Sequence, residues 1–152
     1  MIKKIVKSIL FGFVSVLAGI VMLYIVCPFI NNGEAKKVLN VLLSCDLPQQ
    51  TILLDNVSAA GKLVGNGNGM QYFGAILIRS NLSEEELRDY YKELDSEEYH
   101  IIVEKQESNA IEVIENARIF FDEANDYKDA YIVYSWGNYS GVASEWDIRG
   151  HL

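Results

Sequence analysis

The residue types that most often carry catalysis are few in this chain, and their spacing matches no common catalytic or metal-binding motif. The 152 residues include two histidines, His100 and His151, and two cysteines, Cys27 and Cys45. Zinc sites and Cys–His nucleophile pairs need such residues at set spacings or brought together by the fold. The motifs H-E-x-x-H, C-x-x-C and G-x-S-x-G do not occur. We therefore expect no catalytic residue and no metal site.

A glycine- and asparagine-rich run at residues 65–69 has the composition of a phosphate-binding loop but not its spacing. The dinucleotide fingerprint G-x-G-x-x-G requires a third glycine and a helix directly after the loop. Met70 and Tyr72 stand where that glycine would be, and the apolar residues that follow are typical of a strand. We expect the tip of a β-hairpin, with no nucleotide or other cofactor.

A group of oxygen-bearing side chains could supply ligands to a hard cation such as calcium. It consists of Asp122, Glu123, Asn125, Asp126 and Asp129. An EF-hand loop needs ligands at fixed positions and a central glycine. Ala124 occupies a ligand position, the glycine is missing, and Lys128 interrupts the group. The pattern favours a solvated turn over a calcium site.

Aromatic residues gather near the C-terminus, among glycines and asparagines. Exposed aromatic residues in such company are typical of binding surfaces, although tryptophan is also commonly buried, so both tryptophans could instead belong to the core. We favour Trp146 over Trp136 as the exposed one, because Trp146 lies in the polar tail. The predicted partner-binding residues are Tyr134, Trp136, Tyr139 and Trp146.

The strongest signal is an apolar segment near the N-terminus. No residue from Ser8 to Gly33 is charged. As a helix, residues 9–30 would be about 33 Å long, enough to cross a hydrocarbon core of about 30 Å. In lipid only a helix satisfies its backbone groups within one segment. We therefore predict a transmembrane helix in contact with the lipid bilayer over residues 8–30, ending near Pro28 and a turn at 31–33.

The charges that flank this segment predict its orientation. Lys3, Lys4 and Lys7 precede it, and basic residues favour the cytoplasmic side. The length of the apolar segment favours an uncleaved signal anchor over a cleaved signal peptide. We expect a single-pass protein of a bacterial cell membrane, with residues 1–7 in the cytoplasm and residues 31–152 outside.

Small residues line one side of the predicted membrane helix. Ser8, Gly12, Ser15 and Gly19 are spaced by four, three and four residues, which places them on one stripe. Small residues let membrane helices approach closely, although they are also common in membrane spans in general. The stripe is a candidate surface for self-association.

The charge balance argues against nucleic acid as a partner. The chain has 13 basic and 21 acidic residues and a net charge of −8. All the acidic residues follow the apolar segment, so the region outside the membrane is strongly acidic. Nucleic-acid-binding domains instead carry basic patches.

The rest of the chain predicts one α+β domain. Apolar periodicity favours helices at residues 34–46 and 83–94, the second opened by a capping box of Ser83 and Glu86. Apolar, β-branched and aromatic runs favour strands at 51–64, 70–79, 99–105, 116–121 and 130–136. Short connections imply an antiparallel sheet with two helices on one face.

These observations favour a non-catalytic function. We expect a membrane-anchored domain that binds another protein or acts as its accessory. One alternative is an immunity-like inhibitor of a toxin or enzyme, which a compact acidic domain would suit. The other is a small membrane-tethered hydrolase, since the separation of carboxylates cannot be read from sequence.

Overall fold

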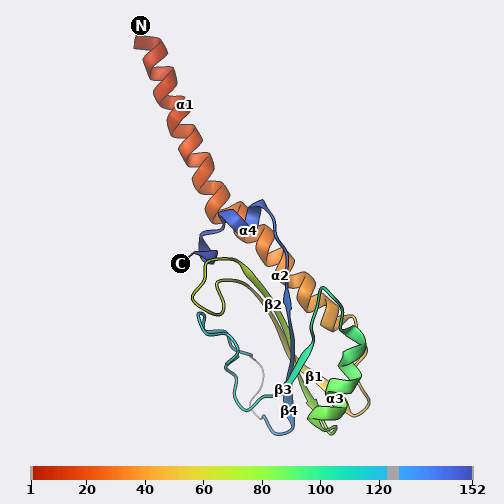
Figure 1. Ribbon diagram of the computed structural model, residues 1–152. Helices are drawn as coiled ribbons and strands as arrows, with labels where there is room; N and C mark the ends of the chain where they lie inside the picture. The colour runs from red at the N-terminus through yellow and green to blue at the C-terminus, as the bar shows by residue number, and fades with distance from the viewer. Residues whose placement is uncertain (1, 123–126, 152) are drawn as a thin grey trace.

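The computed structural model describes residues 2–122 and 127–151 and begins with one long helix (Figure 1). This helix consists of α1 (Ile2–Val21), a π-helical segment (Met22–Val26) and α2 (Cys27–Leu43). No residue of α1 is buried, whereas α2 packs against the sheet. The helix is long and apolar enough to cross a membrane, and its apolar half projects away from the domain.

The sequence predicts that the membrane helix ends near Pro28 and residues 31–33, and this prediction is wrong. The helix continues without a turn to Leu43. A proline ring clashes with the carbonyl group four residues earlier. Here the preceding turn is π-helical, with the Cys27 N–H donating to the Met22 carbonyl five residues back. Wider turns of this kind are a common way to accommodate proline in membrane helices.

The four strands form a single antiparallel sheet, which confirms the α+β class. They are β1 (Thr51–Gly61), β2 (Gln71–Ser80), β3 (Ile102–Lys105) and β4 (Ala130–Gly137), in the order β1-β2-β4-β3. The predicted hairpin pairs β1 with β2. Gly65 and Gly69 in its loop have φ angles of 72° and 142°, a backbone region that favours glycine.

The described part of the chain also has four shorter helical segments. The helix α3 (Glu84–Tyr91) begins with the predicted capping box, and a 3₁₀ turn (Lys92–Leu94) extends it. Near the C-terminus, α4 (Val142–Trp146) is followed by a second 3₁₀ turn (Ile148–Gly150). The helix α4 lies beside the junction of α1 and α2 (Figure 1).

Residues 116–121 do not form the predicted strand. They make only an isolated bridge, between Ala110 and Phe120. Their apolar side chains instead help to cover the sheet face opposite α2, as part of an irregular segment at residues 106–122 that follows β3. Ile111, Ile114 and Phe121 are buried there against β2 and β4. Composition alone suggested a strand because the segment is rich in apolar residues. Residues that cover a sheet face do not need the alternation of apolar and polar side chains that marks a strand.

The sheet therefore has a core on each side. On one side α2 and α3 pack against alternate residues of β2, β3 and β4, with Leu42, Ile76, Leu87 and Val133 at the centre. On the other side the irregular segment packs against the intervening residues of the same strands. This arrangement agrees with the predicted placement of two helices on one face.

Glycines in the sheet let α2 approach it closely. A Cβ atom on Gly74 of β2 would lie 2.8 Å from the Cα atom of Leu39. A Cβ atom on Gly137 of β4 would lie 2.7 Å from Cγ2 of Val38. These distances are shorter than real Cβ contacts, so the position of α2 requires glycine at both sites.

We expect Gly74→Ala to destabilise the fold by about 1–3 kcal/mol, because the added methyl group would push the α2 backbone off the sheet. The measurement is chemical unfolding of the full chain in detergent micelles, followed by circular dichroism. Gly67→Ala is the matched control, since a Cβ atom on Gly67 would meet nothing within 4 Å. Equal stability of the two variants would contradict this account of α2 packing.

Candidate functional site

The residues with catalytic potential form no metal-binding group in the described part of the chain. His100 is on the surface beside Asp95, with Nδ1 and Oδ1 3.8 Å apart, and Cys45 packs against the core shared by α2 and α3. Within residues 2–122 and 127–151, no three His, Cys, Asp or Glu side chains are placed to hold a metal ion. Of the acidic group, Glu123, Asn125 and Asp126 lie outside the described residues.

The four aromatic residues predicted to bind a partner do not share one surface. Tyr134 is buried, and with Trp136 it packs against Phe73 under the irregular segment. Tyr139 instead contacts the edge of the Tyr72 ring, beside α2. Trp146 is 59% exposed on α4. A binding role for these residues stays a prediction, and Trp146 is the one most accessible to a partner.

The small-residue stripe lies along α1, away from the domain. Ser8, Gly12 and Ser15 are exposed and Gly19 is partly exposed. An added Cβ atom on Gly12 or Gly19 would meet nothing within 4 Å. The stripe is therefore open to another helix, and self-association through it stays a prediction.

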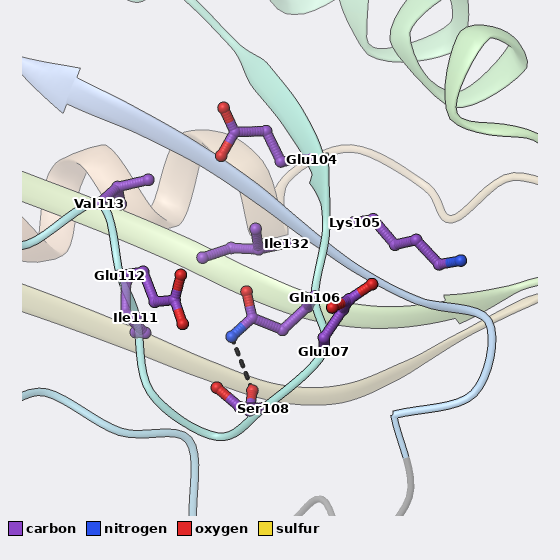
Figure 2. Close-up of a pocket in the computed structure, with 9 residues that line it drawn as sticks. All are labelled: Glu104, Lys105, Gln106, Glu107, Ser108, Ile111, Glu112, Val113 and Ile132. Carbon is purple, nitrogen blue, oxygen red and sulfur yellow. Dashed lines mark hydrogen bonds between the residues drawn. The ribbon is translucent and has the colours of Figure 1, made fainter.

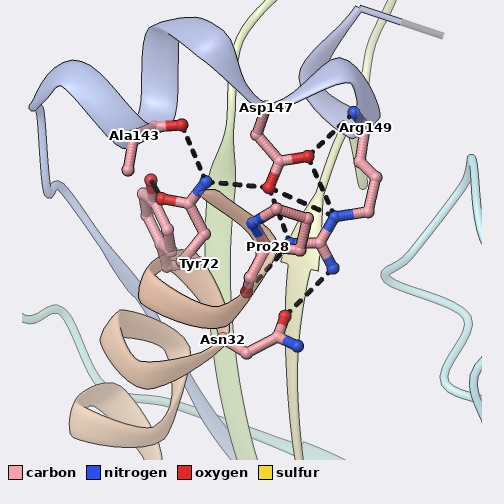
Figure 3. Close-up of polar contacts among 7 residues, drawn as sticks. Pro28, Asn32, Tyr72, Ala143, Asp147 and Arg149 are labelled. Carbon is pink, nitrogen blue, oxygen red and sulfur yellow. Dashed lines mark hydrogen bonds and ion pairs between the residues drawn. The ribbon is translucent and has the colours of Figure 1, made fainter. Parts of the chain in front are cut away.

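A buried polar network joins α2 to the C-terminal segment (Figure 3). Asn31 of α2 is 0% exposed. Its Nδ2 donates to the carbonyl of Ala143, at 3.0 Å, and to Oδ2 of Asp147, at 2.9 Å. Its Oδ1 accepts a hydrogen bond of 2.9 Å from the Tyr72 hydroxyl. We call Asn31, Tyr72, Asp147 and Arg149 the Asn31 network.

Arg149 completes the network and extends it to the surface. Its guanidinium pairs with the buried Asp147 carboxylate, with Nη2 2.7 Å from Oδ2. It also donates to the carbonyl of Pro28 at 3.3 Å and to Oδ1 of Asn32 at 3.0 Å. The residues expected to form a turn therefore make tertiary contacts with a segment more than a hundred residues away.

The surroundings of the network fix its protonation. Burial raises the pKa of the Asp147 carboxyl, but hydrogen bonds from Arg149 and Asn31 outweigh this, so the pKa lies below its usual value of 3.8. Burial raises the pKa of Tyr72 to about 12. At neutral pH the network therefore contains an ionised carboxylate and a neutral phenol.

A surface pocket of about 380 Å³ lies between β3 and the irregular segment (Figure 2). Three carboxylates line it, those of Glu104, Glu107 and Glu112, together with the lysine Lys105. The carboxamide of Gln106 shapes its wall by donating to the Ser108 and Ala110 carbonyls. Its acidic lining suits a cationic group.

The buried Tyr134 is not suited to proton transfer near neutral pH. Burial raises its pKa to about 12, and the neighbouring Glu104 carboxylate adds to the effect. General acids and bases work best with a pKa near the operating pH.

In the Asn31 network, the polar side chains bond to one another and to the backbone. This arrangement suits a structural role, in which α2 and β2 are joined to the C-terminal segment.

Sequence reasoning missed the Asn31 network because it assigned Asn31 to a turn. A signal was present in the apolar face of the predicted helix, which includes Ala35, Val38 and Leu42. Extending that face toward the N-terminus in steps of four residues reaches Asn31 and Cys27, and both are buried. A single asparagine in line with a buried face indicates an internal hydrogen-bond partner.

We expect Asn31→Ala to destabilise the fold by about 2 kcal/mol or more, because it removes the acceptor of the buried Tyr72 hydroxyl and one of the donors to the buried Asp147 carboxylate. Asn32→Ala is the matched control, since Asn32 is exposed and its side chain accepts a hydrogen bond from Arg149. Thermal unfolding of the full chain in detergent micelles compares the two. Similar losses would show that Asn31 has no special role.

We expect the contribution of Asp147 to depend on pH. Because its pKa in the folded state lies below the usual value, the ionised carboxylate stabilises the fold above about pH 4, and this stabilisation is lost as the pH falls through the folded-state pKa. Asp147→Asn should therefore cost about 1–3 kcal/mol at pH 7 and less at pH 3.

The measurement is thermal unfolding of both proteins from pH 7 to pH 2. Glu145→Gln is the control, because Glu145 is an exposed carboxylate two residues away. A stability difference for Asp147→Asn that stays constant over this range would contradict the assignment.

Comparison with protein-family models, with curated proteins and with solved structures finds no match for this chain. The function is therefore inferred from the geometry of the chain itself. Three features bear on the function: the projecting apolar helix, the exposed apolar side chains of the domain, and the Asn31 network that joins α2 to the C-terminal segment.

Proposed function

We propose that the chain is a single-pass membrane protein that binds another protein outside the cell. Residues 8–30 would anchor it in the cell membrane, with residues 1–7 in the cytoplasm, as the N-terminal lysines favour. Support for anchoring comes from α1, which is apolar and has no buried residue. The orientation and the bacterial source remain part of the proposal.

The binding function is inferred from an exposed apolar surface at the C-terminal end of α2, the end farther from α1. It comprises the exposed side chains of Leu43, Leu47, Ile52 and Leu53, which lie within one short stretch of sequence. Ile52 and Leu53 are 54% and 40% exposed and, as neighbours on one strand, point to opposite faces of the sheet. Apolar side chains exposed at one end of a domain can mark a protein-interaction site. We call these four residues the distal apolar surface.

The edge strand β1 supplies backbone groups that can recognise a partner at the distal apolar surface. It is the longest strand described, with 11 residues, and it stands at the edge of the sheet. Within the described ranges, β1 pairs only with β2. An edge strand offers backbone donors and acceptors to an incoming extended segment, while exposed side chains select its sequence. We infer that an extended segment of the partner adds to β1 beside Ile52 and Leu53.

The chain direction supports a position of this surface far from the proposed anchor. The strand β1 runs from Thr51 near the end of α2 back to Gly61, where an added Cβ atom would lie 3.9 Å from the Arg149 carbonyl. Arg149 in turn contacts Pro28. The distal apolar surface is therefore at the opposite end of the domain from the anchor, where a partner can reach it.

We expect a photo-crosslinking amino acid at position 52 or 53 to form an adduct with one defined protein in cells that express the full chain. A lysine at position 53, introduced with the crosslinker at position 52, should lower the yield about tenfold, since a charge would be buried at the contact. The adduct is detected by electrophoresis and identified by mass spectrometry.

The matched control carries the crosslinker at Phe120, which is 46% exposed but lies on the irregular segment. An adduct of the same protein with equal yield at position 120 would contradict the assigned surface.

The proposed orientation has its own test. Protease added to cells stripped of their outer wall should digest the adduct, and full protection would overturn the proposed orientation. A toxin or enzyme inhibited in the adduct would identify the immunity-like form of this function.

A further inference from the structure

The short helix α4 exposes two large apolar side chains on one face. Val142 and Trp146 are 74% and 59% exposed, whereas Ala143 and Ser144 between them are buried. Residues four apart lie on the same side of a helix. Tryptophan is highly buried on average, so this degree of exposure calls for an explanation.

Hydrogen bonds fix the level of α4 along the long helix. Asn31 donates to the carbonyl of Ala143 and to the Asp147 carboxylate, the neighbours of Val142 and Trp146. One turn closer to the N-terminus, Arg149 donates to the Pro28 carbonyl. The exposed pair is therefore held beside residues 28–31, where the apolar segment ends.

That level coincides with the membrane surface if residues 8–30 span the bilayer, so this inference rests on the proposed function. The hydrocarbon core is about 30 Å thick, and the headgroup region adds several ångströms on each side. Phe29 of α2 is exposed at the same level. Tryptophan is enriched in this region because its ring is apolar while its N–H can donate to headgroups.

We propose that Val142 and Trp146 insert into the bilayer interface and hold the domain against the outer membrane surface. The apolar chemistry of the pair favours lipid at this site, as does its continuity with the anchor. The Asn31 network transmits this contact to the sheet through Tyr72. The domain would then be attached at two points, its helix and α4, which restricts rotation of the domain about the helix axis.

Electrostatic attraction to lipid does not drive this contact. The residues after the apolar segment include all 21 acidic residues and 10 of the 13 basic ones. Such a domain is repelled by anionic headgroups. We therefore expect the insertion to occur in zwitterionic lipid and to persist in high salt, as apolar burial requires.

The test uses the tryptophan fluorescence of the full chain in phosphatidylcholine vesicles. The chain has two tryptophans, so Trp136→Phe leaves Trp146 as the only one. Lipids brominated near the headgroup end of the acyl chains should quench about half of the Trp146 emission, as for a side chain 5–10 Å below the surface. Lipids brominated at the chain ends should quench it less, and aqueous acrylamide should have little effect.

The control is Trp146→Phe, in which Trp136 should respond to neither brominated lipid, because Trp136 packs against Phe73 inside the domain. Subtracting the emission of Trp146→Phe from that of the wild type gives the emission of Trp146. The result therefore holds even if Trp136→Phe does not fold. Quenching of Trp146 by acrylamide alone would overturn the inference. Protection from both quenchers would also overturn it, and would indicate that a protein surface covers α4.

A third variant separates this inference from the proposed anchor. Phe13→Trp, in a chain with both native tryptophans changed to phenylalanine, reports on the middle of the span. Strong quenching of this variant by chain-end bromine, without quenching of Trp146, would refute the interfacial contact and leave the anchor intact. No quenching at position 13 would refute the anchor itself.

Discussion

One buried carboxamide sets the arrangement of the two ends of this chain. Asn31 has no exposed surface, so burial would be costly unless both its nitrogen and its oxygen found partners. The partners come from a strand in the middle of the chain and from the C-terminal segment. The close packing of α4 against α2 follows from this requirement, and so does the level at which Trp146 is held.

The two halves of the long helix have different surroundings. Its first half has apolar residues on every side and makes no contact that buries them. Its second half buries a single face against the sheet and exposes Lys36 and Lys37 on the other. The change from one pattern to the other occurs within about two turns, at the π-helical segment and Pro28. The glycines at 74 and 137 then let the second half lie close to the strands.

The sequence predicted most elements of the fold, because these depend on local patterns. The capping box at Ser83, the hairpin at residues 65–69 and the apolar strand β2 each carry a signal within a few residues. The wrong predictions concern segments whose role is set by distant contacts. The strand expected at 116–121 is a cover for the sheet, and the turn expected at 31–33 is helical because Asn31 and Asn32 bond to the C-terminal segment.

The candidate site was harder to predict for the same reason. Exposed and buried aromatic residues look alike in a sequence, and the fold placed Tyr134 inside and Trp146 outside. The partners of Asp147 are two residues and more than a hundred residues away in the chain. The distal apolar surface joins the end of a helix to an edge strand, and whether a strand stands at an edge is known only once the sheet order is known.

The absence of a turn between α1 and α2 has a mechanical consequence. If α1 lies in lipid as proposed, the continuous helix would act as a lever between lipid and solvent. The 17 residues of α2 extend about 25 Å, so a tilt of about 20°, ordinary for a membrane helix, would displace its far end by about 9 Å. Tilt in turn depends on bilayer thickness. Membranes of different thickness would therefore present the end of β1 to its surroundings at different heights and angles.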